Sequence, residues 1–242
     1  MATPTLYIGN KTYSSWSMRP WLALKWAGLA FEERVIPLGG VGYGKSQIPE
    51  VLAVSPSGRV PALDVNGLTI WDSLAIAEWA AEKHPSLWPQ DPTARALARS
   101  AAAEMHSGFA ALRSHYSMNL RRKGVPPKQA PADNVLADIA RIDELWSSLR
   151  ARFGGAGDHL CGPRSIADAM FTPVATRFRS YGVALSAPAR AYANTLLADP
   201  AFQEWDAAAQ VEPWFIPQAD ALYAVGSTAG LLLVVWLVLR PR

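Results

Sequence analysis

The chain has 242 residues, a length that suits one large domain or two ordinary ones. Half of the residues are apolar and 18% are charged, so the chain can bury a sizeable core and intrinsic disorder is excluded. The net charge is +3 and no basic run concentrates it, which excludes an electrostatic footprint for nucleic acid. Cys161 is the only cysteine, which excludes intramolecular disulfides and fits a reducing compartment. With no secretory leader visible at the N-terminus, we expect a cytoplasmic protein.

Three prolines between residues 85 and 92 mark a change in composition. Because proline fixes φ and disfavours helix at the residue before it, this stretch predicts an extended linker. Short β-prone runs alternate with helical ones before it, and long helical patterns follow it. We therefore expect a first domain at residues 1–84, a linker at 85–92, a helical domain at 93–220 and a tail at 221–242.

The first domain is expected to form a small mixed sheet. Residues 5–9 and 31–36 are β-prone, and a helix is expected between them that begins near Arg19 or Pro20. Residues 60–65 and 68–71 flank Asn66-Gly67, the strongest short signal for a β-hairpin. The next helix, as far as Glu82, completes the order β-α-β, a gap, then β-β-α.

The second domain is expected to be helical throughout. Residues 93–120 and 135–153 have helical periodicity, and Ser165 and Asp168 have the spacing of a capping box that starts another helix. On the first of these helices, His106, Phe109 and Arg113 share one face by their i, i+3, i+7 spacing. That face is expected to turn toward the cleft between the domains, although such a stripe also suits plain core packing.

The first chemical motif is the serine-rich turn after the first strand, at residues 14–19. Hydroxyls at a helix N-terminus can donate to an anion, and the free N–H groups there favour a bound thiolate or carboxylate. Ser14 and Ser15 are the candidates for this role. Simple capping of the helix explains the same residues equally well.

Two further motifs are Val60-Pro61, at the start of an expected strand, and Asp72-Ser73, at the start of an expected helix. A cis bond between Val60 and Pro61 would leave the backbone of Val60 free to pair with a peptide-like ligand, whereas an ordinary trans turn would not. Asp72 and Ser73 could hold the amine and the carboxylate of an α-amino acid, or could serve only as an N-cap. No histidine has ligand-like spacing with carboxylates, so no metal site is expected.

In this order, the three motifs resemble those of cytosolic glutathione transferases, and the resemblance covers residues 3–217. It implies an α/β thioredoxin-like N-terminal domain followed by an all-α C-terminal helical domain. The run Ser-Ser-Trp-Ser-Met-Arg at residues 14–19 is most similar to the serine-type zeta-class motif Ser-Ser-Cys-x-Trp-Arg. Two positions differ from that motif, because Trp16 replaces the cysteine and Met18 replaces the tryptophan.

The resemblance implies an enzyme that activates the glutathione thiolate for attack on a small electrophile, and that acts as a homodimer. Ser14 would donate to the glutathione sulfur, with Ser15 as the alternative. Val60 would pair with the cysteinyl backbone ahead of cis-Pro61. Glutathione is then a co-substrate, and no metal takes part.

The ends of glutathione would be held by polar and charged residues. The resemblance implies that Asp72 and Ser73 hold the γ-glutamyl end and that Lys45 or Arg59 reaches the glycyl carboxylate. A second-substrate pocket would include His106, Phe109, Arg113 and Arg177.

Two other functions remain open at this stage. One is a glutathione-dependent cis-trans isomerase of the maleylacetoacetate type, for which Arg177 and Arg179 are candidate carboxylate anchors. The other is a non-enzymatic binding protein of the same family. The identity of the electrophile is not given by the sequence.

An uncharged run at residues 221–239 begins at Ala221 and ends at Leu239. A bilayer core takes about 20 apolar residues in helical form, so the run is just long enough to span one. A C-terminal membrane anchor, a tail buried against the protein or a partner, and a non-native extension are the three interpretations.

Overall fold

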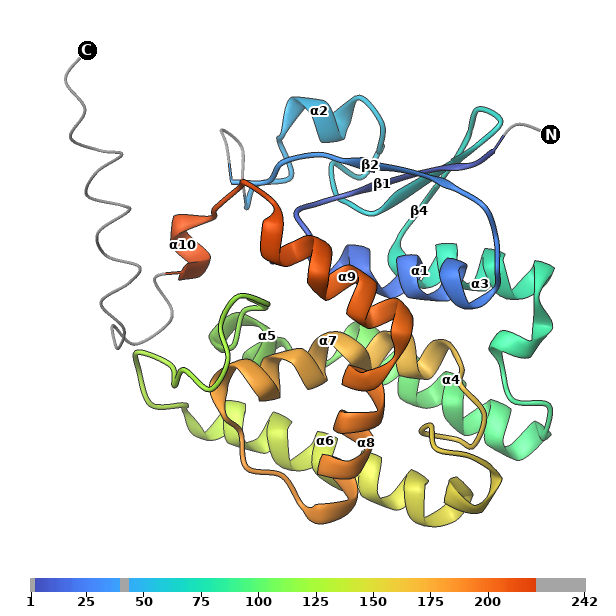
Figure 1. Ribbon diagram of the computed structural model, residues 1–242, viewed down its shortest axis with the longest axis vertical. Coiled ribbons are helices and arrows are strands. Elements are labelled where there is room, and N and C mark those ends of the chain that lie inside the picture. The colour runs from blue at the N-terminus through green and yellow to red at the C-terminus, as the bar shows by residue number, and fades with distance from the viewer. Residues whose placement is uncertain (1–2, 40–43, 221–242) are drawn as a thin grey trace.

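A four-stranded sheet lies over a group of helices in the computed structural model, which describes residues 3–39 and 44–220 (Figure 1). The strands are β1 (Thr5–Ile8), β2 (Glu32–Val35), β3 (Ala62–Val65) and β4 (Leu68–Trp71), in the spatial order β2-β1-β3-β4. β1 pairs with β2 in parallel, and the other two pairs are antiparallel. The expected mixed sheet is therefore confirmed.

The hairpin between β3 and β4 has the two-residue loop that the sequence predicts. Val65 pairs with Leu68, and both loop residues have positive φ, 55° at Asn66 and 84° at Gly67. A type I′ turn needs positive φ at both positions and matches the twist of the strands. The Asn-Gly pair therefore fixes the register of the hairpin.

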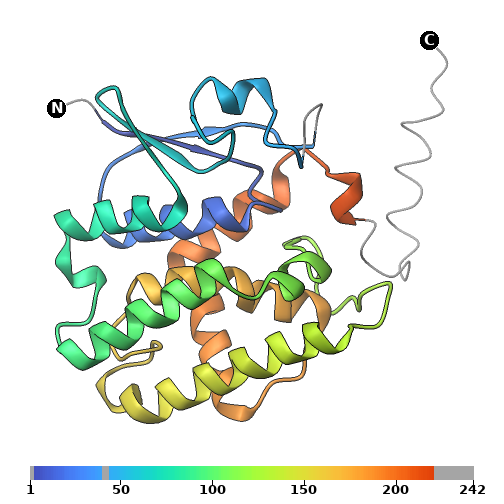
Figure 2. The same ribbon diagram turned by 180° about the vertical axis from the view of Figure 1, so that it is seen from behind.

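Helices α1 (Ser15–Trp26) and α3 (Ser73–Lys83) lie side by side between the sheet and the other helices (Figures 1 and 2). α1 begins at Ser15, so the expected start near Arg19 or Pro20 is wrong. Ser14 caps the helix earlier, and Pro20 is tolerated inside it at the loss of one backbone hydrogen bond. A short helix, α2 (Pro49–Leu52), lies in the gap between the second and third strands, where no element was expected.

The connection between the two parts is not simply extended, which corrects the sequence prediction. A short 3-10 helix, η1 (Pro85–Leu87), lies within it. Leu87 and Trp88 are buried in the main core, and Trp88 Nε1 donates to Glu78 Oε2 at 3.1 Å. The apolar side chains of this segment therefore dock it on α3. The exact division at residues 84 and 93 stays a prediction.

The rest of the described chain is helical, and we refer to residues 92–220 as the helical part. Its elements are α4 (Pro92–Ser107), α5 (Ala110–His115), α6 (Asp133–Phe153), the 3-10 helix η2 (Gly154–Ala156), α7 (Ile166–Tyr181), α8 (Ala187–Ala198), α9 (Pro200–Val211) and α10 (Pro217–Asp220).

The single helix expected at residues 93–120 is broken into α4 and α5, so that prediction is wrong. Gly108 ends α4, and Phe109 follows in the left-handed region with φ of 57°. A helix cannot continue through a left-handed residue. His106, Phe109 and Arg113 therefore do not lie on one continuous helical face.

None of the helices within residues 3–39 and 44–220 is both long and apolar enough to cross a bilayer. The run at residues 221–239 lies outside the described residues.

α7 runs through the centre of the helical part and is buried along most of its length. The predicted capping box forms between Ser165 and Asp168 at its N-terminus. The buried Asp168 carboxylate also accepts hydrogen bonds from Leu160 N (2.9 Å) and the Tyr192 hydroxyl (2.7 Å). Burial, followed by the neighbouring Asp168, raises the pKa of Tyr192 well above its usual value, so this hydroxyl stays a donor.

We expect Asp168→Asn to lower the free energy of unfolding by about 3 kcal/mol, because the amide turns a donor toward groups that are themselves donors. Urea denaturation followed by circular dichroism measures the change. The control is Asp158→Asn at an exposed position, for which a change within about 0.5 kcal/mol is expected. Equal midpoints for the two variants would contradict the structural role of Asp168.

Candidate active site

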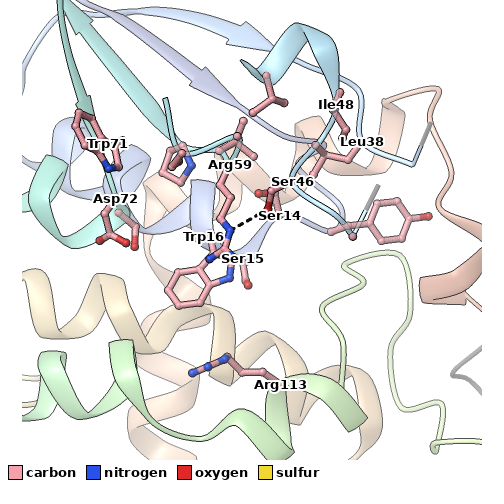
Figure 3. Close-up of a pocket in the computed structure, with 18 of the residues that line it drawn as sticks. Ser14, Ser15, Trp16, Leu38, Ser46, Ile48, Arg59, Trp71, Asp72 and Arg113 are labelled. Atoms are coloured by element: carbon pink, nitrogen blue, oxygen red, sulfur yellow. Dashed lines mark hydrogen bonds between the residues drawn. The ribbon is translucent and has the colours of Figure 1, made fainter. Parts of the chain in front are cut away.

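A cavity of about 810 Å³ opens between the sheet part and the helical part (Figure 3). This size lies within the range of pockets that take small molecules. The cavity is lined from both sides of the molecule. The lining residues that the sequence analysis had singled out are Ser14, Ser15, Arg59, Val60, Pro61, Asp72, Ser73, His106 and Arg113.

Ser14 lies at the N-cap of α1, where its oxygen accepts from Ser17 N at 3.4 Å. Its hydroxyl donates to Ser17 Oγ at 2.7 Å, and Ser17 Oγ also accepts from Gly9 N at 3.1 Å. A hydroxyl hydrogen rotates to suit its partners, so Ser17 can donate to Ser14 when Ser14 turns its own hydrogen toward a ligand. This geometry is compatible with both interpretations of Ser14, as a cap of the helix and as a hydrogen-bond donor to a bound anion.

Ser15 is the first residue of α1 and differs from Ser14 in its partner. Arg177 Nη2 donates to Ser15 Oγ at 3.0 Å. Arg177 also donates from Nε to the Tyr116 carbonyl at 2.8 Å and is itself buried. Arg177 therefore acts on the cavity through Ser15 and does not form part of its wall.

The peptide bond between Val60 and Pro61 is cis, one of the two alternatives that the sequence left open. The preceding turn needs glycine at position 58, where φ is +64° and an added Cβ would lie 2.4 Å from the Ser46 carbonyl oxygen. The next residue, Arg59, donates from Nε to Ser46 Oγ at 3.1 Å (Figure 3). Lys45 is exposed next to this turn. Its described neighbours in the chain, Gly44 and Ser46, line the cavity.

Asp72 and Ser73 lie at the N-terminus of α3. Asp72 is the N-cap, with φ of 77°, and its Oδ1 accepts from Leu74 N at 2.8 Å. The Ser73 side chain is 1% exposed, and its Oγ has no hydrogen-bond partner among the described residues. A buried hydroxyl without a partner costs free energy, so a ligand atom that accepts a hydrogen bond from the Ser73 hydroxyl would remove that cost and be stabilised in the cavity.

The helical part contributes His106 and Arg113 to the lining of the cavity, but not Phe109, which is buried in the main core. Phe109 is the N-cap of α5, in the left-handed region, and α5 carries Arg113. In Figure 3, Arg113 lies across the cavity from the serines and Trp16. The prediction for Phe109 is therefore corrected.

Trp16 and Arg19, for which no role was expected from the sequence, contact each other beside the cavity. The Arg19 guanidinium lies over the Trp16 ring at 4.1 Å, and Arg113 lies 5.4 Å from the same ring. Arg19 is 0% exposed, and within the described chain its Nη1 and Nη2 have no hydrogen-bond partner. Burial, followed by the nearby Arg177 and Arg113, lowers the pKa of Arg19. The one available signal was that the motif at residues 14–19 ends in arginine.

With this geometry established, comparison with known proteins identifies the family. A family model for the N-terminal domain of glutathione S-transferases matches residues 13–83. Maleylacetoacetate isomerase of Rattus norvegicus is 30% identical over 207 residues, which are 83% of this chain and 90% of that protein. The chain belongs to the glutathione transferase superfamily, close to its zeta class.

Two further comparisons agree. Maleylacetoacetate isomerase of Pseudomonas aeruginosa is 31% identical over 208 residues, 82% of this chain and 93% of that protein. A solved glutathione transferase homologue from Burkholderia, with bound glutathione, has a TM-score of 0.65 and 25% identity, and the match covers 86% of this chain and 99% of that one. The expected fold, a thioredoxin-like α/β part followed by an all-α part, is confirmed.

Cys161 is buried in the core of the helical part of this glutathione transferase. Burial, followed by the charge of Asp168, raises the pKa of the Cys161 thiol to about 12. At pH 8 a thiol with this pKa is ionised to roughly one part in ten thousand.

We therefore expect Cys161 to resist iodoacetamide at pH 8 in the folded protein and to react in urea, with mass spectrometry as the measurement. Because this is the only cysteine in the chain, every labelled molecule reports it. Rapid labelling under native conditions would contradict the burial of the thiol.

Proposed function

We propose that the chain binds glutathione in the cavity and activates its thiol for attack on a small electrophile. The observation that carries this proposal is that two helix N-termini, at Ser14 and Asp72, and the cis turn at Val60-Pro61 all face one cavity. Helix N-termini favour anions, and an extended backbone segment pairs with a peptide. Glutathione is a peptide that carries carboxylates and a thiol.

In this proposal Ser14 donates its hydroxyl hydrogen to the glutathione sulfur. A free thiol has a pKa near 8.5 and is mostly protonated at neutral pH, so a donor at a helix N-terminus raises the reactive thiolate fraction. The return hydrogen bond from Ser17 keeps the Ser14 oxygen satisfied. Ser15, which accepts from the Arg177 cation, is the alternative donor.

The ends of glutathione are assigned from the same geometry. The ammonium of the γ-glutamyl group would pair with the Asp72 carboxylate, and its carboxylate would accept from the unpartnered Ser73 hydroxyl. Arg59, exposed at the cavity rim, would reach the glycyl carboxylate, and Lys45 is the alternative. The backbone of Val60 would pair with the cysteinyl unit.

We expect Ser14→Ala to lower kcat/KM by at least tenfold, about 1.4 kcal/mol of transition-state stabilisation, with the fold retained. Steady-state turnover of a panel of electrophiles measures the loss, and Ser15→Ala is the matched comparison. A large loss for Ser15→Ala alone would move the thiolate-stabilising role to Ser15 and its Arg177 partner. Glutathione bound without turnover of any electrophile would favour the non-enzymatic binding protein.

A second function, glutathione-dependent cis-trans isomerisation of a diacid, is favoured by one observation. Arg19 and Arg113 lie against the Trp16 ring, and the buried Arg177 donates to Ser15, so cations lie at and just behind this wall of the cavity and would suit carboxylates. The relatives named maleylacetoacetate isomerase support it. A cis diacid of the maleylacetoacetate type therefore belongs in the panel beside neutral electrophiles, and turnover of the diacid alone would make isomerisation the main reaction.

We also propose that the chain acts as a homodimer in the cytoplasm. β4 is the edge strand of the sheet, and its side chains Leu68 and Trp71 are 62% and 49% exposed. Three residues apart in a strand, these two side chains point to opposite faces of the sheet, and Trp71 lines the cavity. An unpaired edge strand that exposes a large apolar side chain such as Leu68 is typical of a surface that a partner covers.

The run at residues 221–239 carries a further proposal, that it tethers the enzyme to a membrane. We expect the full chain to stay in the membrane pellet after a carbonate wash and to need detergent for release. A variant that ends at Asp220 is the control and should be soluble. If the full chain is soluble without detergent, the tail packs on protein or is a non-native extension.

A further inference from the structure

His106, in the helical part, contacts Asp72 of the proposed γ-glutamyl site. It lies in the last turn of α4, and its Nε2 is 3.4 Å from Asp72 Oδ2. The two side chains line the same cavity and are partly open to it, with exposed fractions of 28% for His106 and 47% for Asp72. This contact joins two helices from opposite walls of the cavity.

The chemistry of the imidazole and the carboxylate determines which ring nitrogen of His106 carries the hydrogen. An ionised carboxylate only accepts hydrogen bonds, so the ring nitrogen that faces it must carry the hydrogen. The other ring nitrogen, Nδ1, is buried and has no hydrogen-bond partner within the described residues. The arrangement therefore favours the tautomer with its hydrogen on Nε2, the ring nitrogen that faces Asp72 Oδ2.

Asp72 has its two oxygens held from different sides. Oδ1 accepts from Leu74 N within α3, and Oδ2 faces His106 from α4. A carboxylate held at both oxygens loses less rotamer freedom when it pairs with a ligand ammonium. The His106 ring is fixed in turn by its edge-on contact with Trp16, at a centroid distance of 5.5 Å.

We propose that His106 is a positioning residue that orients the Asp72 carboxylate toward the ammonium of the γ-glutamyl group. Because His106 lies in the helical part and Asp72 in the sheet part, the affinity for glutathione then depends on the contact between these two side chains. The inference rests on the proposed glutathione site. It assigns to His106 a role in glutathione binding, distinct from the role in the second-substrate pocket expected from the sequence.

Two variants of similar size separate hydrogen bonding from packing. His106→Phe keeps a ring against Trp16 but has no donor, whereas His106→Gln places an amide donor close to the position of Nε2. Calorimetry measures the binding of two ligands, glutathione and glutaryl-cysteinyl-glycine, which lacks only the γ-glutamyl amino group. Circular dichroism melting checks that each variant is folded, and Ser107→Ala, at the exposed next residue, is the control.

We expect His106→Phe to weaken glutathione binding about tenfold, the effect of losing one hydrogen bond to a charged group, and His106→Gln to bind like the wild type. The wild type and His106→Phe should bind the analogue equally, because it has no ammonium for Asp72 to hold. In an Asp72→Asn background, His106→Phe should have little further effect.

Each remaining outcome overturns the inference. An equal loss for glutathione and the analogue would mean that His106 acts through packing on Trp16. A loss in His106→Gln as large as that in His106→Phe would mean the same. Unchanged binding in His106→Phe would remove His106 from the glutathione site. If the wild type binds neither ligand, the proposed glutathione site itself is wrong and the role of His106 falls with it. The other outcomes leave glutathione binding intact and overturn only the role of His106.

Discussion

Helix α1 is packed on both sides, and the site depends on this constraint. It contacts α3 within the sheet part and α7 and α9 in the helical part. Nine of its residues are buried, although they include serines and an arginine. Polar groups buried at such a junction must find partners, and the contacts of α1 with the helical part supply several of them. The site is therefore complete only where the two parts are in contact.

Two buried arginines, Arg19 and Arg177, lie where α1 packs against the helical part and give the region beside the cavity positive charge. Arg19 donates from Nε to the Met170 carbonyl at 3.2 Å, and Arg177 donates to Ser15, so each links α1 and α7. Burying positive charge costs free energy unless it is paired, and the Trp16 ring offsets only part of that cost for Arg19. The cavity that opens beside these groups is thus suited to anions such as a thiolate or a carboxylate.

The loop before Ser14 is held by residues some 200 positions away in the chain. Glu212 accepts from the backbone N–H groups of Lys11 and Thr12, both at 2.8 Å. Asp220 accepts from the Tyr13 hydroxyl at 3.0 Å and from Asn119 at 2.6 Å. Burial, followed by the charge of Asp220, raises the pKa of Tyr13, so its hydroxyl keeps the proton that it donates. The end of the helical part thereby fixes the loop that leads into Ser14 and Ser15.

The sequence by itself determined the features that arise from short-range chemistry. The Asn-Gly hairpin and the capping box at Ser165 depend on neighbours within a few residues and formed as expected, and Ser14 and Asp72 are N-caps, one of the two interpretations that the sequence left open for each. Only the tertiary structure decided which face of the helical part meets the site. The break at Gly108 and Phe109 changes the direction of the chain, and helical spacing carries no information about such a turn. The contacts of Arg19 with Trp16, of Arg177 with Ser15 and of His106 with Asp72 likewise join distant segments, and packing sets them.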